Sequence, residues 1–477
     1  MKKILRIFTC ILCFSITPIY SQNNPNPNAN LDAFIQDEME TRNFPSVSTV
    51  IVKDGKIVWL ESYGYADIEN GIAVTDSTNF LLASISKLFT GTAAMQLYEN
   101  GLLDLDEDIN NHLPWQLTIP NHENEPITSR HLMTHTSSIQ DNYGAMATYY
   151  GYPDPSISLS NCMQDYFSTT GNNYNISANF LNQAAGTIYE YSNMASALNG
   201  YLVENIAQQP FNEFCKSNIF EPLCMNKTAW FMSELDSNEV ARPYQYINGN
   251  YEPYAHYGFA DYPNGLLRSN VLDMANFMIA YMNGGFFGDN SILTTASVNA
   301  MWSEQIPQLE DKQGLNWYQE LLYYSGGSAL LWGHSGGESG VRTHLYIDET
   351  NDVGICVLTN GEGDALYICD ELYDYGLSLS SANGITPNCE TSVGMVEKNE
   401  NNLKVYPNPA TDIVTFEFTD KVRNCKLLIS DAKGTKYIEQ PIRTKQHQMS
   451  LDLPAGIYFY QLIGTEQAVD VLSLIHI

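Results

Sequence analysis

Residues 83–90 read ASISKLFT and open a predicted helix that extends to Gly101. Apolar side chains recur along it at helical spacing, at positions 85, 88, 89, 93 and 97. Ser84 and Lys87 stand three residues apart, so they share one face of that helix. An amine whose pKa is lowered by burial can take the proton of a serine hydroxyl, and the pair therefore predicts an activated nucleophile. The pattern alone also fits a serine at a helix N-terminus beside a solvated lysine, so it needs support elsewhere in the chain.

Two later segments supply that support. Residues 186–193 read GTIYEYSN, and residues 333–337 read GHSGG. They provide the side chains of Tyr191, Asn193, His334 and Ser335, which are of the types that donate and relay protons in acyl transfer. The three segments together favour acyl transfer by an activated serine.

The order S-x-x-K, Y-x-N and K/H-[ST]-G resembles the serine β-lactamase and penicillin-binding-protein superfamily. The resemblance is to its class C-like group, which includes D-Ala-D-Ala carboxypeptidases and family VIII esterases, and it covers residues 31 to 378. It implies that Ser84 is the nucleophile and that Lys87 and Tyr191 form the proton-transfer pair. Which of the two is the acylation base stays open.

The same resemblance implies the roles of the remaining site residues. Asn193 would orient Lys87 and the substrate amide, while His334, Ser335 and Gly336 would line the facing strand. The backbone N–H groups of Ser84 and Gly337 would form the oxyanion hole. No metal or organic cofactor is expected, and the substrate would be a small molecule or a peptide.

A competing motif involves Ser335, because GHSGG also matches the G-x-S-x-G elbow of α/β-hydrolases. An elbow leads from a strand into a helix, whereas residues 341–347 alternate as a strand does. An elbow serine also needs a histidine downstream. His344 is too near in sequence for that role, and His447 and His476 lie beyond a predicted linker, so we favour Ser84 as the nucleophile.

The charge of the chain argues against two classes of partner and indicates a domain boundary near residue 400. The net charge of −31 argues against nucleic acid and anionic membranes as partners. Residues 22–401 carry 12 basic and 46 acidic side chains, whereas residues 402–477 carry 8 of each. Residues 379–401 are rich in Ser, Asn and Glu without apolar periodicity and predict a linker.

We therefore expect four segments, which are a signal peptide (1–21), a hydrolase domain (22–378), the linker (379–401) and a β-sandwich (402–477). The signal peptide follows from basic residues before a short apolar run, and no later run is long enough to span a membrane. The expected fold is α/β (α+β). An antiparallel sheet would be built from both ends of the hydrolase domain, from strands near 47–62 and 329–359, with flanking helices and an inserted helical region.

The C-terminal segment has alternating strands near 414–418, 426–429, 449–453 and 457–462. Its stretches KVYPNPATD (404–412) and LPAGIY (453–458) resemble the type A sorting domain of the type IX secretion system of Bacteroidetes. The resemblance implies export by that machinery, to the medium or to the outer-membrane surface. The tail VLSLIHI (471–477) lacks the basic residues expected of such domains, so we do not expect it to be the natural terminus.

Several weaker patterns receive plainer interpretations. His131 and His135 have a spacing that could bind a metal, but a packed turn is favoured. The alternating acids at 104–108 lack the glycine and glutamate of a calcium loop and are interpreted as a solvated turn. An oxidising compartment permits a bridge such as Cys215 to Cys224.

The substrate is the least constrained part of the prediction. His334 stands where relatives that bind a carboxylate have a lysine, and at neutral pH it is mostly uncharged. Arg342 and Arg268 are the nearest fixed cations that we can suggest. We therefore expect short uncharged esters to be cleaved better than β-lactams. The alternatives are a β-lactamase proper and a catalytically silent binding or adhesion protein on the same fold.

Overall fold

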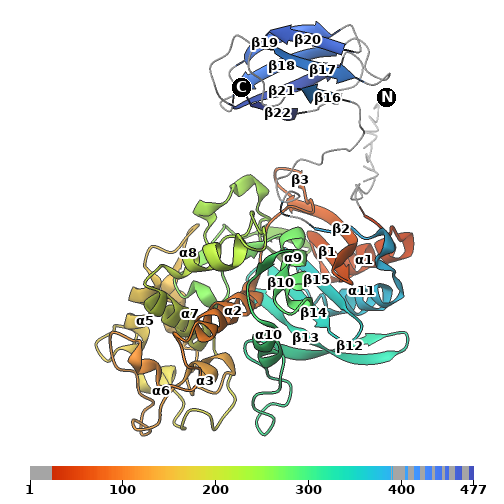
Figure 1. Cartoon of the computed structure of the whole chain (residues 1–477). Coiled ribbons are helices and arrows are strands. Elements are labelled where there is room, and N and C mark those ends of the chain that lie inside the picture. Colours follow the sequence, from red (N-terminus) through yellow and green to blue (C-terminus); the bar gives the residue numbers. More distant parts are fainter. Residues whose placement is uncertain are drawn as a thin grey trace, which may run out of the picture. The chain divides into compact units, whose positions relative to one another are not determined.

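The computed structural model describes residues 24–387, Cys389 and the seven strands of the C-terminal region (Figure 1). The chain divides into two compact units, Met1–Gly394 and Met395–Ile477. The expected signal peptide and most of the expected linker lie outside the described residues. Every helix within the described part is too short or too polar to cross a membrane.

An antiparallel sheet of seven strands forms the centre of the first unit, in the order β12-β13-β14-β15-β1-β2-β3. Its strands are β1 (Ser46–Lys53), β2 (Lys56–Asp67), β3 (Ile72–Ala73), β12 (Tyr318–Tyr324), β13 (Gly327–Glu338), β14 (Val341–Asp348) and β15 (Val353–Thr359). The first and last strands of the unit meet where β1 pairs with β15, with Val47 opposite Thr359. This arrangement confirms the sheet predicted from both ends of the segment.

Both faces of the sheet are covered, which explains why β1 is buried along nearly its whole length. On one face, Val47 and Ile51 pack with the helices α1 (Ala29–Arg42) and α11 (Leu366–Ser378). On the other face, Val50 and Val52 join a larger core that contains the helical region. The two-residue period of a strand produces this division, because successive side chains point to opposite faces.

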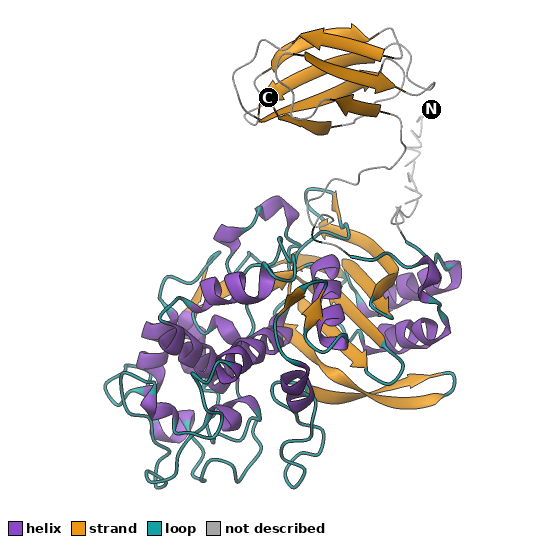
Figure 2. Cartoon of the chain, viewed as in Figure 1, coloured by secondary structure: helices purple, strands orange, loops and turns teal. Residues whose placement is uncertain are grey.

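The inserted helical region lies between β3 and β12, as predicted (Figure 2). Its helices are α2 (Ser86–Glu99), α3 (Ser129–Met133), α4 (Tyr143–Met146), α5 (Leu159–Phe167), α6 (Ile176–Asn179), α7 (Asn193–Ala207), α8 (Phe211–Cys215), α9 (Val271–Met282) and α10 (Thr295–Met301). Helix α2 is buried over almost its whole length and packs against α7. This contact brings the first two sequence motifs together.

The second unit consists of two antiparallel sheets, in agreement with the predicted β-sandwich. One contains β16 (Leu403–Tyr406), β17 (Ile413–Phe418) and β20 (Gln446–Ser450). The other contains β18 (Cys425–Asp431), β19 (Lys436–Ile442), β21 (Ile457–Gly464) and β22 (Leu472–His476). Three of these strands, β16, β19 and β22, were not predicted from the sequence.

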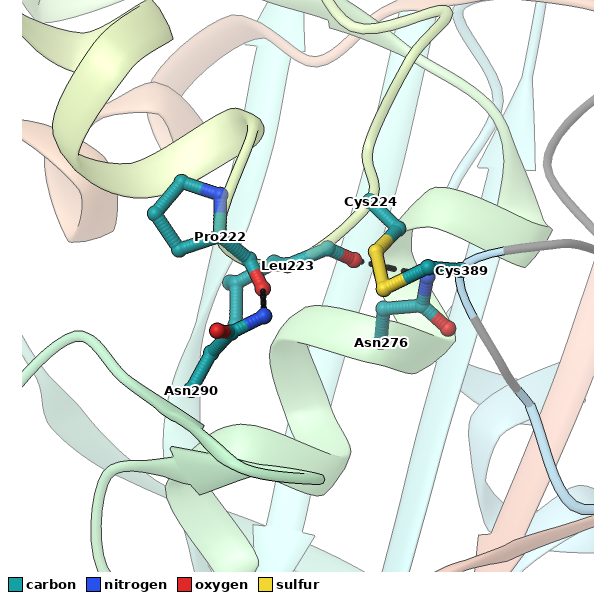
Figure 3. The surroundings of a disulfide bond; sticks show 6 residues. All are labelled: Pro222, Leu223, Cys224, Asn276, Asn290 and Cys389. Atoms are coloured by element: carbon teal, nitrogen blue, oxygen red, sulfur yellow. Dashed lines mark hydrogen bonds between the residues drawn. A yellow bond between two sulfur atoms is a disulfide. The ribbon is translucent and has the colours of Figure 1, made fainter.

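A disulfide joins Cys224 to Cys389, across 165 residues of sequence (Figure 3). The suggested bridge between Cys215 and Cys224 is therefore wrong. Cys215 is a free, buried thiol at the end of α8, where it packs as an apolar side chain. Cys224 follows a turn that is fixed by a hydrogen bond from α9, because the side-chain amide of Asn276 donates to Leu223 O at 2.9 Å. The bridge fixes the segment that follows α11 to the helical region.

Candidate active site

Ser84 lies in a short 3-10 turn, η1 (Ala83–Ile85), that leads directly into α2. The residue before it, Ala83, has a φ of 49°, which is the left-handed conformation that non-glycine residues adopt at a cost of about 1 to 2 kcal/mol. Two hydrogen bonds from distant parts of the chain hold the turn in place. Leu82 N donates to Leu267 O at 2.8 Å, and Thr343 Oγ1 donates to Leu82 O at 2.6 Å. Thr343 of β14 and Leu267 thus fix the backbone that presents Ser84.

Gly336 allows β13 to pass close to that turn. A Cβ atom at this position would lie 2.3 Å from Leu82 O and 2.3 Å from Thr343 Oγ1, so only glycine fits. The next residue, Gly337, lines the same cavity as Ser84. The third motif is therefore part of a strand and faces the first motif, which contradicts the strand-to-helix geometry of an α/β-hydrolase elbow.

The side chain of Lys87 is completely buried, and its Nζ has three hydrogen-bond partners. Its Nζ donates to Ser84 Oγ at 3.2 Å, to Asn193 Oδ1 at 2.7 Å and to Asn264 O at 2.7 Å. None of these acceptors is a carboxylate. Burial lowers the pKa of Lys87 to about 7, against a weaker opposite effect of Asp141, Asp261 and Glu338. At neutral pH the amine is therefore uncharged in a large fraction of molecules.

Tyr191 completes the group around Ser84. Its phenol hydrogen-bonds the Ser84 side chain, and Lys87 Nζ lies 5.0 Å from the centre of its ring. Burial raises the pKa of Tyr191 well above its usual range, so the phenol keeps its proton at neutral pH. The His135 ring packs against it at 4.3 Å between centroids, and His135 Nδ1 accepts a hydrogen bond from Ser192 N at 3.2 Å. His135 thus belongs to the packed turn that was predicted.

Asp141 was not identified from the sequence, although it organises the second motif. Its two oxygens accept four hydrogen bonds at the start of α7, from Ser192 Oγ, Asn193 N, Asn193 Nδ2 and Met194 N. The bond from Asn193 Nδ2 is 2.8 Å long and turns Asn193 Oδ1 toward Lys87. A carboxylate is favoured at a helix N-terminus, where backbone N–H groups lack partners.

The third motif lies on β13 and is supported by Tyr318 of β12. The Tyr318 hydroxyl donates to Ser335 Oγ at 2.7 Å and accepts from Ser335 N at 2.9 Å. His334 is buried between aromatic rings, with Tyr318 at 4.9 Å and Tyr191 at 6.2 Å between centroids. Burial, together with the charge of Lys87, lowers the pKa of His334 to about 3. The imidazole is therefore neutral at pH 7, as the sequence indicated.

A cavity of about 570 Å³ opens over Ser84. Its wall includes Tyr191, Asn193 and Gly337 from the predicted site. The other lining residues are Ala83, Tyr143, Met146, Ala147, Tyr150, Tyr152, Phe259, Asp261, Asn264, Gly265 and Glu338. Among these described residues there are two acids and neither a lysine nor an arginine.

The two arginines suggested from the sequence do not line this cavity. Arg268 is 2% exposed, and its guanidinium donates to backbone oxygens of Trp230, Leu266 and Tyr257. It therefore supports the fold. Arg342 lies opposite Gly337 on β14 and donates to its neighbour Val341 O at 2.9 Å.

The remaining candidate ligands from the sequence have structural partners. His131 Nδ1 accepts from Thr128 N at 3.3 Å in the cap of α3. In the acidic turn, Asp106 pairs with Arg130, and Asp108 caps a short 3-10 helix. Within the described residues, no group of three or more His, Cys, Asp or Glu side chains is placed to hold a metal ion.

Comparison with known families gives two matches. The family model described as Beta-lactamase matches residues 31–373, and the model described as Secretion system C-terminal sorting domain matches residues 404–474. Protein flp of Staphylococcus aureus (strain MRSA252) is 27% identical over 215 residues, which are 45% of this chain and 40% of that protein. Beta-lactamase-like protein 4 of Dictyostelium discoideum is 28% identical over 265 residues, which are 52% of this chain and 44% of that protein. The chain thus spans less than half the length of these curated relatives.

Solved structures share the fold. An octameric penicillin-binding protein homologue from Pyrococcus abyssi has a TM-score of 0.58 at 21% identity, covering 94% of this chain and 98% of that one. FmtA from Staphylococcus aureus has a TM-score of 0.59 at 18% identity, covering 76% and 91%. The D-amino acid amidase of Ochrobactrum anthropi SV3 has a TM-score of 0.57 at 23% identity, covering 73% and 98%. At these identities the likeness concerns the fold, and both predicted resemblances are confirmed by the family models.

Proposed function

The chain belongs to the beta-lactamase family, a family of serine hydrolases, and on that premise we propose that it is an exported enzyme that forms an acyl-enzyme on Ser84. One observation carries the proposal. Lys87 Nζ lies 3.2 Å from Ser84 Oγ in a buried pocket where its other acceptors are neutral. A buried amine of this kind is a suitable base for a serine nucleophile at neutral pH.

In the proposed acylation step, uncharged Lys87 takes the proton of Ser84 while Ser84 Oγ attacks the substrate carbonyl carbon. The backbone N–H groups of Ser84 and Gly337 stabilise the resulting oxyanion, and each such donor contributes about 3 to 4 kcal/mol in other hydrolases. Tyr191 then gives its proton to the leaving oxygen or nitrogen and regains one from Lys87. In deacylation the proton transfers run in reverse. Water takes the place of the leaving group and gives a proton to Tyr191 as Tyr191 passes one to Lys87, and Lys87 returns a proton to Ser84 Oγ as its bond to the acyl carbon breaks.

This assignment of Lys87 as base and Tyr191 as acid is supported by their surroundings. The pKa of Lys87 is lowered to about 7, whereas burial keeps Tyr191 protonated. The charge of Asp141 also reaches Lys87 through the Asn193 amide. The lowered pKa of Lys87 suits a general base at neutral pH, and Tyr191 holds the proton that the leaving group needs.

The proposed substrates are uncharged at the group that follows the scissile carbonyl. The lining residues of the cavity include neither Lys nor Arg in the described part of the chain, and His334 is neutral at pH 7. A carboxylate such as that of a β-lactam would therefore find no lysine or arginine among these lining residues. The proposed substrates are therefore esters, amides or peptides that are uncharged or cationic, rather than compounds with a carboxylate at this position.

Export is proposed from the second family match. A sorting domain at residues 404–474 supports delivery by the type IX secretion machinery, to the medium or to the outer-membrane surface. The Cys224–Cys389 disulfide is consistent with a protein that folds in an oxidising compartment.

The activity is tested with two colorimetric substrates and the full-length chain. We expect measurable hydrolysis of p-nitrophenyl butyrate and a much lower kcat/KM for nitrocefin, which carries a carboxylate. Nitrocefin turnover at a rate equal to the ester rate would assign the protein to the β-lactamases proper. Absence of turnover with both substrates and absence of a covalent adduct would favour a binding protein.

A further inference from the structure

Two carboxylates line the cavity that contains Ser84, and the proposed acyl transfer uses neither of them. Asp261 precedes a short 3-10 helix, η7 (Tyr262–Asn264), and Glu338 ends β13. Ion pairs within the described residues involve other acids, so no lysine or arginine lies within ion-pair distance of either carboxylate. Glu338, and Asp261 when it is ionised, can therefore offer negative charge to a ligand.

Asp261 is 2% exposed, and only one of its oxygens is satisfied. Its Oδ2 accepts from Asn264 Nδ2 at 2.8 Å, whereas Oδ1 has no hydrogen-bond partner in the described part of the chain. Lys87 does not supply it, because the partners of its Nζ are Ser84, Asn193 and Asn264. Leaving a buried carboxylate oxygen unpaired is unfavourable, because the group has lost its hydrogen bonds to water.

The negative charge in this part of the cavity also acts on Asp261 itself. Burial raises its pKa to about 7, and the nearby charges of Asp141 and Glu338 act in the same direction. A cation in the cavity would oppose both effects. A second anion would add to them.

Aromatic rings complete this region. The Tyr150 hydroxyl donates to Glu338 Oε2 at 3.2 Å, and the Tyr150 ring packs against Phe259 at 5.3 Å between centroids. Tyr143 and Tyr152 also line the cavity and are 72% and 71% exposed. Rings beside carboxylates attract organic cations, because the face of each ring is negative.

We propose that Asp261, Glu338 and Tyr150 form an ammonium subsite that binds the positively charged amino group of the substrate. The substrate class is then an ester or amide that carries a primary amine and, near it, an apolar group. Phe259 and Met146 would contact this apolar group of the substrate. The inference rests on the proposed function, because it names the substrate class of the same cavity. It also explains why the described residues of the cavity wall include two acids and neither a lysine nor an arginine.

Binding is tested apart from catalysis, by isothermal titration calorimetry on the full-length protein at pH 8. The probes are 2-phenylethylamine, which is a cation at this pH, and 2-phenylethanol, its neutral counterpart of the same shape. We expect the amine to bind at least about tenfold more tightly, since an exposed cation–π contact and a half-buried ion pair each contribute about 1 kcal/mol. Equal affinities for the two probes would overturn the subsite.

A variant assigns the preference to its residues. Glu338→Gln keeps the shape of the side chain and should lower the ratio of the two affinities about fivefold or more. The matched control Glu349→Gln removes a charge from an exposed turn and should leave the ratio unchanged. A full preference retained in Glu338→Gln would contradict the proposal. Hydrolysis of p-nitrophenyl butyrate without any amine preference would overturn this inference alone, whereas amine binding without hydrolysis would overturn the proposed function alone.

Discussion

The substitution Asp141→Asn tests how the second motif controls Lys87. Asp141 accepts four hydrogen bonds, and an asparagine at this position would turn its NH₂ group toward two of those donors. The start of α7 would lose part of its cap, and Asn193 would be oriented less firmly toward Lys87. We expect the maximal kcat/KM to fall about 10- to 100-fold, because a modest displacement of a catalytic group has effects of that size.

The change in charge has a separate effect on the pH dependence. Hydrogen bonds of 2.7 and 2.8 Å, joined by one amide group, link Lys87 Nζ to Asp141 Oδ2. The two charges therefore lie within about 8 Å, where their attraction is about 2 kcal/mol at an effective dielectric constant of about 20. This attraction raises the pKa of Lys87, so its removal should lower that pKa by about 1.5 units. The starting value is about 7.

The assay is the pH profile of kcat/KM for p-nitrophenyl butyrate between pH 5 and pH 9. If uncharged Lys87 is the base, activity falls as pH decreases through its pKa, with a midpoint near pH 7 in the native protein. In Asp141→Asn this midpoint should move to lower pH. The control Asp236→Asn removes an exposed helix-capping carboxylate and should leave the profile unchanged. An unmoved midpoint in Asp141→Asn, or one that moves to higher pH, would refute the electrostatic link.

The remaining predictions concern the disulfide, the proton relay and the second unit. Replacing Cys224 and Cys389 by serine should lower the free energy of unfolding by about 2 to 5 kcal/mol, because the bridge closes a long loop; an identical melting temperature with and without reductant would contradict this. Lys87→Ala and Tyr191→Phe should each reduce kcat/KM by more than about a thousandfold and be far from additive together, whereas additive losses would show that they do not share a task. A chain that ends at residue 400 should keep its kcat/KM, and a folded but inactive product would mean that the second unit contributes to the site.

The parts of the fold that the sequence predicted are those with strong local signals. The hairpin around Asp54 and Gly55, the helix after Ser84 and the late strands all have clear periodicity or turn residues. Strand β12 was missed because it lies at the sheet edge, where most of its residues are half-buried and do not alternate. The Cys224–Cys389 pairing also could not be predicted, since it joins positions 165 residues apart and depends on the fold.

The candidate site was predictable where short motifs carry the chemistry. Ser84, Lys87, Tyr191 and Asn193 meet as the resemblance implied. Asp141 was missed because it caps a helix that begins more than fifty residues later in the chain. No local sequence pattern distinguishes such a carboxylate from one that faces the solvent. The same is true of Asp261 and Glu338, which only the fold brings to the cavity.

The two arginines suggested as substrate contacts are an example of what the sequence alone could not predict. Each was the nearest fixed cation that the sequence offered, and the fold uses Arg268 to hold backbone carbonyl groups. The sign of the charge around the cavity therefore depends on which side chains the fold turns inward.

Covalent labelling of Ser84 tests the central claim most directly. The full-length protein and its Ser84→Ala and Ser335→Ala variants are treated with a fluorophosphonate, which loses fluoride as a serine oxygen bonds to its phosphorus, and the intact masses are measured. We expect one adduct in the native protein and in Ser335→Ala, located on the peptide that contains Ser84, and none in Ser84→Ala. An adduct that persists in Ser84→Ala and disappears in Ser335→Ala would contradict the account.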